Sequence, residues 1–169
     1  MVKVSTNGGF TAVAYVAFTG SAGSYERIFE LGDSTQQISI AMSRSDVSQN
    51  MNAQLKGVSG YMIVSTNSPI IQNEWAVYAI RYRVSDSTLE IFKNGVSIVS
   101  STVSSIPDFT ANYGYIGKSS WSSDAYFNGN IGGLYLYDRC LSNGEMSFVS
   151  YQLTLKGIPL TANFNLFFD

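Results

Sequence analysis

The feature that most constrains the fold is a hairpin signature within a series of short β-rich segments. Residues 88–99 place Asn94 and Gly95 between two arms rich in β-branched and apolar side chains. Asn-Gly is a strong short-range hairpin signal, because both residues tolerate the positive φ angles of a tight turn. A chain built from such units pairs its strands antiparallel and buries one face of each sheet.

Further strands are expected along most of the chain. Residues 37–42 alternate apolar and polar side chains with a period of two, as a half-buried strand does. Segments of similar composition are 10–18, 25–31, 52–56, 61–65, 75–84, 113–117, 130–137 and 162–168. Ser142 and Glu145 have the spacing of a capping box and predict one short helix. Many short strands separated by turns predict one all-β domain, a two-sheet antiparallel jelly-roll sandwich.

Composition excludes several classes of protein. The 169 residues fit one domain, and a hydrophobic share of 45% with 13% charged residues permits a sizeable core. The chain has no histidine, so it has no Ser-His-Asp or Cys-His catalytic site and lacks the commonest zinc ligand. Its single cysteine, Cys140, excludes an internal disulfide.

Charge and hydropathy limit the partners. The net charge is −2 and the basic residues are scattered singly, so nucleic-acid binding is not expected. No run reaches the roughly 20 apolar residues that span a bilayer. The first residues lack the apolar region of a secretion signal, which predicts another export route or a piece of a longer chain.

Four segments together resemble laminin-G-like domains of the concanavalin A-like lectin/glucanase superfamily. They are the strand 10–18, the Glu74-Trp75 strand, the hairpin 89–95, and 115–137 followed by Leu141, Ser142 and Glu145. The resemblance implies a β-sandwich that binds glycan or matrix and performs no chemistry. It also implies an extracellular, cell-surface or virion-associated location. In this resemblance the strand that precedes residue 10 is missing or reduced to Val2–Val4, which favours an excised domain or one completed by a neighbour.

The same resemblance raises a glycosidase and a calcium site as alternatives. Related glycosidases supply paired carboxylates from an E-x-D-x-E strand, which is lacking here; the nearest spacing is Glu26, Glu30 and Asp33. Calcium-binding members carry an acidic residue where this chain has Gly132 and Gly133. We therefore expect no enzyme and no cofactor, with calcium as an alternative for which Asp33 and Asp124 are isolated candidates.

Trp121 is the first candidate for ligand contact. It lies in a loop of serines, where an exposed indole can stack on a sugar ring while Asp124 and Asn128 bind hydroxyls. The alternative is that Trp121 folds back over the edge of the sandwich.

A second candidate is one face of the strands 75–84, 88–93 and 130–137. Alternation directs Tyr78, Ile80 and Tyr82 to the core and Arg81 to the opposite face. The same alternation adds Arg83, Glu90, Phe92, Tyr135 and Tyr137 to that outer face. Arg81 and Tyr135 are the predicted contact residues there. The alternative is an ordinary solvated face with cross-strand pairs.

These observations predict a non-catalytic binding module for a glycan or matrix ligand. The main alternative is a structural or protein-interaction module of a surface assembly or virion, in which the apolar tail 163–169 contacts neighbouring domains or subunits. The tail is otherwise expected to form the last strand of the sandwich.

Overall fold

A computed structural model describes residues 2–4, 8–21, 23–45 and 48–155. One sheet, named sheet I, consists of β3 (Glu26–Gly32), β4 (Ser39–Arg44), β5 (Asn50–Gly57), β6 (Gly60–Pro69) and β11 (Tyr113–Ile116). The other, sheet II, consists of β2 (Phe10–Phe18), β7 (Trp75–Arg83), β8 (Thr88–Lys93), β9 (Val96–Thr102) and β12 (Gly129–Tyr137). Two short strands, β1 (Val2–Val4) and β10 (Phe109–Ala111), pair with each other. The short helix η1 (Val84–Asp86) and the helix α1 (Asn143–Leu155) complete the elements.

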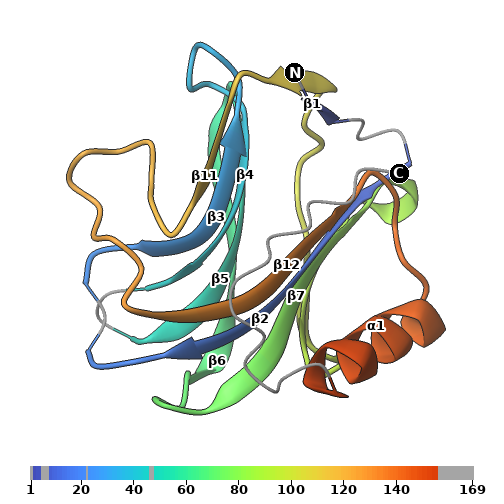
Figure 1. The fold of residues 1–169 in the computed structure, drawn as a ribbon. Helices are drawn as coiled ribbons and strands as arrows, with labels where there is room; N and C mark the ends of the chain where they lie inside the picture. The colour runs from blue at the N-terminus through green and yellow to red at the C-terminus, as the bar shows by residue number, and fades with distance from the viewer. Residues whose placement is uncertain (1, 5–7, 22, 46–47, 156–169) are drawn as a thin grey trace.

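The two five-stranded sheets are antiparallel and pack face to face (Figure 1). Their orders are β11-β3-β4-β5-β6 and β12-β2-β7-β8-β9. The strands alternate between the facing core and the outer sides, so Ile40, Met42 and Leu55 of sheet I meet Ile80 and Ile91 of sheet II in one buried cluster. The predicted two-sheet antiparallel jelly-roll sandwich is confirmed.

Every strand predicted within the described residues coincides with an observed strand, with ends that differ by a few residues. At the predicted hairpin, Asn94 and Gly95 have φ angles of 51° and 81°, as a two-residue turn requires. Strand β10 is missed, since a three-residue strand that pairs with the distant β1 leaves no local pattern. The segment 162–168, predicted as a last strand or an apolar tail, lies outside the described residues.

Helix α1 covers the outer face of sheet II (Figure 1). Its capping box is formed as predicted: the Ser142 N–H donates to Glu145 Oε2 at 2.8 Å, and the Glu145 N–H donates to Ser142 Oγ at 3.3 Å. Met146 and Leu153 pack on Val77 and Phe92 in a second buried cluster. Sheet II is therefore covered on both sides, which explains why nearly every residue of β2 and β7 is buried.

Candidate functional site

The outer face of sheet I is polar, and the strand register arranges it in rows. One row runs from Tyr113 through Gly32, Ser39 and Lys56 to Tyr61. A second row consists of Tyr115, Glu30, Ala41, Gln54 and Ile63, and a third of Arg27, Ser43, Asn52 and Ser65. A β-bulge between Arg27 and Phe29 changes the alternation of β3, so that Arg27 and Glu30 share this face.

A loop over residues 117–128, named here the Trp121 loop, lies on this outer face beside β11 and β3 (Figure 1). Glu30 is its anchor: Ser120 donates to this carboxylate from its backbone N–H at 3.1 Å and from Oγ at 2.6 Å. The Tyr113 hydroxyl donates at 3.0 Å, and the single hydroxyl proton of Ser119, whose Oγ lies 3.1 Å from Glu30, is shared between Glu30 and Asp124. Burial is the main cause that raises the pKa of Tyr113, and the adjacent Glu30 raises it further, so the phenol stays a donor at neutral pH.

Asp124 supports the loop rather than facing solvent. Its carboxylate accepts a hydrogen bond from Ser119 Oγ at 2.8 Å and lies 3.3 Å from a guanidinium nitrogen of Arg27. The side chain is only 10% exposed. Asp124 thus lies close to Trp121 in the loop, with one side of its carboxylate committed to internal contacts.

Trp121, Lys56 and Tyr61 form a partly exposed cluster, named here the aromatic platform. The Lys56 ammonium lies 4.9 Å from the Trp121 ring centre and 5.2 Å from the Tyr61 ring centre. The indole is 42% exposed and the Tyr61 side chain 45%. Burial raises the pKa of Tyr61, an effect that a hydrogen bond from Trp121 opposes. The exposed indole and phenol can stack on the apolar face of a ring, and the ammonium can bind polar groups at the rim of that ring.

Asn128 lies at the end of the loop against the β2–β3 connection. Its Oδ1 accepts a hydrogen bond from Thr19 Oγ1 at 2.9 Å, and its backbone carbonyl accepts one from the Thr19 N–H at 2.9 Å. These contacts tie Asn128 to Thr19. The Lys56 and Tyr61 side chains of the aromatic platform belong to β5 and β6, away from the β3 end of sheet I.

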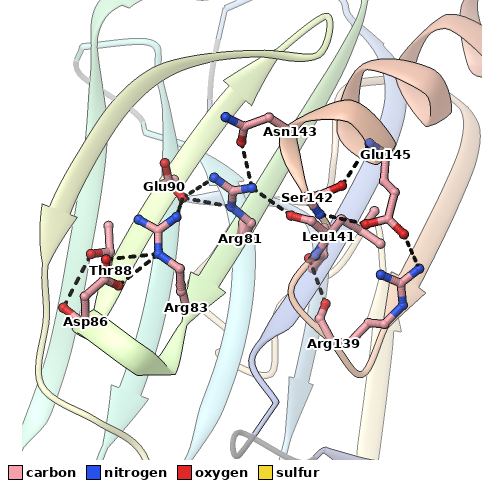
Figure 2. A network of polar contacts seen from close by, with 11 residues as sticks. Arg81, Arg83, Asp86, Thr88, Glu90, Arg139, Leu141, Ser142, Asn143 and Glu145 are labelled. Atoms are coloured by element: carbon pink, nitrogen blue, oxygen red, sulfur yellow. Dashed lines mark hydrogen bonds and ion pairs between the residues drawn. The ribbon is translucent and has the colours of Figure 1, made fainter.

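The predicted outer face of sheet II is found, but its predicted accessibility is wrong. Arg81 is 3% exposed, because the start of α1 and the segment before it cover the guanidinium. The Arg81 Nε donates to Glu90 Oε2 at 2.8 Å, and Nη1 donates to the Leu141 carbonyl at 2.7 Å and to Asn143 Oδ1 at 2.9 Å (Figure 2). Arg81 thus ties sheet II to α1.

Tyr135 is half-buried and packs against the second apolar cluster, which lies between sheet II and α1. Phe92, also expected on an accessible face, is 1% exposed, with the Arg81 guanidinium 4.7 Å from its ring centre. The side chains point away from the core as alternation predicts, but the helix occupies the space that a ligand would need.

The family model described as the concanavalin A-like lectin/glucanases superfamily, a laminin G type, matches residues 2–147. The chain belongs to this superfamily. The match covers the strands of both sheets and the capping box of α1. A search of curated protein sequences finds no significant match.

Several solved structures are similar to this chain in fold at low sequence identity. A heptameric SAP-like pentraxin from Limulus polyphemus has a TM-score of 0.67 at 16% identity, covering 89% of this chain and 73% of its own. Domain 4 of the arabinanase AbnA from Geobacillus stearothermophilus, in complex with arabinotriose, has 0.67 at 21%, covering 85% and 66%. The CBM40 of the Ruminococcus gnavus IT-sialidase, bound to α2,3 sialyllactose, has 0.64 at 12%, covering 84% and 82%.

The residues present do not fit the calcium site of the superfamily. Gly132 and Gly133 lie in β12, where they offer no side-chain oxygen. The Asp33 carboxylate accepts hydrogen bonds from Thr35 and from the N–H groups of Gln37 and Ile38. Burial raises the pKa of Asp33, but these hydrogen bonds outweigh it and lower the pKa below its usual value. Among the described residues no group of three or more His, Cys, Asp or Glu side chains could hold a metal ion.

The glutamates nearest in spacing to a glycosidase pair lie on opposite sides of sheet I. Glu26 faces the core, where its Oε2 lies 2.7 Å from an Nη atom of the buried Arg44. Glu30 faces outward and anchors the Trp121 loop. The bulge between them separates the two carboxylates, so they cannot flank one glycosidic bond.

Sequence reasoning missed Lys56 and Tyr61, and it considered Glu30 only as part of a possible glycosidase pair. A signal for Glu30 was present, because a charged residue inside an apolar strand requires a partner. Lys56 and Tyr61 flank a tight turn and carry no motif, and only the fold brings the 117–128 loop against them.

Proposed function

We propose that this domain binds carbohydrate through the aromatic platform of Trp121, Tyr61 and Lys56, without catalysing a reaction. The observation that carries the proposal is the partly exposed indole, held beside a phenol and an ammonium by a loop anchored on Glu30. Sugar rings present C–H faces that stack on aromatic rings and hydroxyls that bind charged donors. Asp124 lies close to Trp121 in the same loop and extends the proposed contact region, whereas Asn128, bound to Thr19 at the end of the loop, is left out of it.

The superfamily assignment and two of the similar structures support this proposal. The arabinanase domain was solved with arabinotriose and the CBM40 with sialyllactose. The glycan ligand of this domain is part of a cell surface, of matrix or of a polysaccharide. The domain accordingly functions in an extracellular, cell-surface or virion-associated location. Among the described residues no helix is long and apolar enough to cross a membrane.

The buried guanidinium of Arg81 and the half-buried Tyr135 are left out of the proposed site. Both serve the contact between sheet II and α1, as described above.

The test is a glycan array, screened with and without calcium, followed by Trp121→Ala. We expect loss of at least about tenfold in affinity, which corresponds to 1.4 kcal/mol, with the fold retained. Trp75 is a matched control, since it is 44% exposed but stacks on Tyr15, with 4.7 Å between the ring centres. Trp75→Phe should keep binding and leave Trp121 as the sole indole, so its fluorescence should change on adding glycan. Equal binding by Trp121→Ala contradicts the proposed site.

A second candidate function is protein assembly, favoured by the outer side of α1. Phe148, Tyr151 and Leu155 follow each other at helical spacing and are 64%, 59% and 55% exposed. Light scattering across a concentration series tests this function. Assembly is supported if the mass of the wild type rises with concentration while the Phe148→Lys variant remains a monomer. If the wild type is a monomer at every concentration and the glycan array is positive, glycan binding alone is supported.

A further inference from the structure

Three side chains on the outer face of sheet I carry buried polar atoms without a hydrogen-bond partner. They are Arg27 Nε, Ser43 Oγ and Gln54 Oε1. The residues are 4%, 0% and 3% exposed. Buried polar groups are nearly always satisfied, since an unpaired one loses its hydration without compensation. We name these three residues the inner strip.

The inner strip is one contiguous patch. Its members come from the adjacent strands β3, β4 and β5, and Arg27 is the direct cross-strand partner of Ser43. Gln54 pairs with Ala41, two residues before Ser43, so it lies diagonally next to Ser43. The Arg27 Nε lies 3.4 Å from Glu30 Oε2, close enough for charge attraction but not in hydrogen-bonding geometry.

The other unpartnered atoms among the described residues are isolated. Tyr82 Oη and Ser150 Oγ belong to β7 and α1, in different parts of the molecule. Burial raises the pKa of Tyr82, so this group remains a neutral phenol. Within the part of the chain that the structure describes, only the outer face of sheet I collects such atoms from neighbouring strands, and that is the face on which the aromatic platform lies.

Over this face the Trp121 loop is held mainly by polar contacts, which can be exchanged for contacts with water, while Phe127 near its end packs on Phe18 of the core. The Trp121 loop is held by hydrogen bonds to the Glu30 carboxylate and by the Arg27–Asp124 ion pair. Because water can replace these contacts when the loop opens, the net free energy of opening is smaller than the sum of the separate interactions.

We propose that the inner strip is a second part of the glycan site, reached when the Trp121 loop moves aside, and that it binds adjacent hydroxyls of a sugar. This inference rests on the proposed function and deepens it. Gln54 Oε1 only accepts, Arg27 Nε only donates, and Ser43 Oγ does both. A vicinal diol matches this set, because each hydroxyl offers one donor and two acceptors. The platform then stacks on the ring whose hydroxyls the strip binds.

The test compares Ser43→Ala and Gln54→Met with the wild type in two measurements. The first is thermal unfolding without ligand, in which both variants should keep or raise the Tm, since each removes an unpaired buried group. The second is affinity, by calorimetry, for the tightest binder in a panel of soluble neutral, sialylated and uronate-bearing di- to tetrasaccharides. We expect each variant to weaken binding roughly five- to twentyfold. Ser150→Ala is the control, because it removes an unpartnered hydroxyl outside the strip and should leave affinity unchanged.

The outcomes separate this inference from the proposed function. If Trp121→Ala loses binding while Ser43→Ala and Gln54→Met bind like the wild type, the platform stands and the inner strip is overturned. If Ser43→Ala and Gln54→Met both have a lower Tm than the wild type without ligand, the strip holds structural water, and the inference that it is a glycan site is overturned. If the wild type binds no member of the panel and no glycan of the array, the proposed function fails and the inference fails with it.

Discussion

The two outer faces of the sandwich are covered by different kinds of structure. On sheet II, helix α1 excludes water with apolar side chains. The buried charge of that sheet, Arg81, donates its hydrogen bonds to Glu90 and to the segment that starts α1. On sheet I, a loop without regular structure covers polar side chains through hydrogen bonds and leaves three atoms unpartnered. The first cover is built for stability, while the second retains unused hydrogen-bonding capacity beside exposed aromatic rings. The difference indicates which face is available to a ligand.

The largest effect should come from breaking the apolar cover of sheet II. Phe92→Ala removes a ring that is 1% exposed between the sheet and α1, and it should lower the free energy of unfolding by about 3–5 kcal/mol. Phe148→Ala on the opposite side of the helix is the control, with an expected change within about 0.5 kcal/mol. Urea unfolding measures both. Similar losses for the two variants would contradict the assignment of Phe92's face as the one that anchors the helix.

The charge network of Figure 2 should give the next largest effect. Arg81→Met leaves Glu90, itself 7% exposed, without its main partner and should cost about 3 kcal/mol. Arg83 remains 3.6 Å from Glu90 and is partly exposed, which limits the loss. The double variant Arg81→Met with Glu90→Met should recover most of the stability, because no unpaired charge remains. A double variant as unstable as the single one would show that the network is needed for more than neutralising Glu90.

The polar cover of sheet I should respond differently. Glu30→Gln presents an NH₂ group to some of the donors now facing the carboxylate, so we expect a loss of about 1–3 kcal/mol that acts on the loop. Hydrogen exchange should accelerate at the Ser120 and Trp121 amides while β7 stays protected. Glu74→Gln is the matched control, since it removes a carboxylate from an ion pair with Lys93 that is partly exposed. Uniform acceleration in all strands would mean that the loop and the sandwich unfold together.

The difference between the two covers also explains how much could be predicted from the sequence. The strands, the Asn94-Gly95 turn and the Ser142–Glu145 cap follow from local patterns, because period-two alternation and capping geometry act over a few residues. The alternation also assigned Arg81 to the outer face correctly, but it contains no information on what packs over that face. The platform could not be predicted, because Lys56 and Trp121 meet only through the tertiary fold.

The smallest expected effect concerns the pH dependence of the cap that starts α1. The hydrogen bond from Arg139, followed by the one from the Ser142 N–H, lowers the pKa of Glu145 from 4.5 to about 2. Because the folded pKa is depressed, the ionised form stabilises the folded state. This contribution is fully present above pH 4.5 and is lost as the pH falls toward about 2.

The Tm of the wild type should therefore exceed that of Glu145→Gln by a small margin above pH 4.5, and the margin should shrink below it. The Arg139–Glu145 pair is exposed, so added salt should reduce the margin as well. The absence of any margin between the two proteins across this pH range would contradict a role for the charge and would assign the cap to hydrogen bonds alone, which glutamine can also accept.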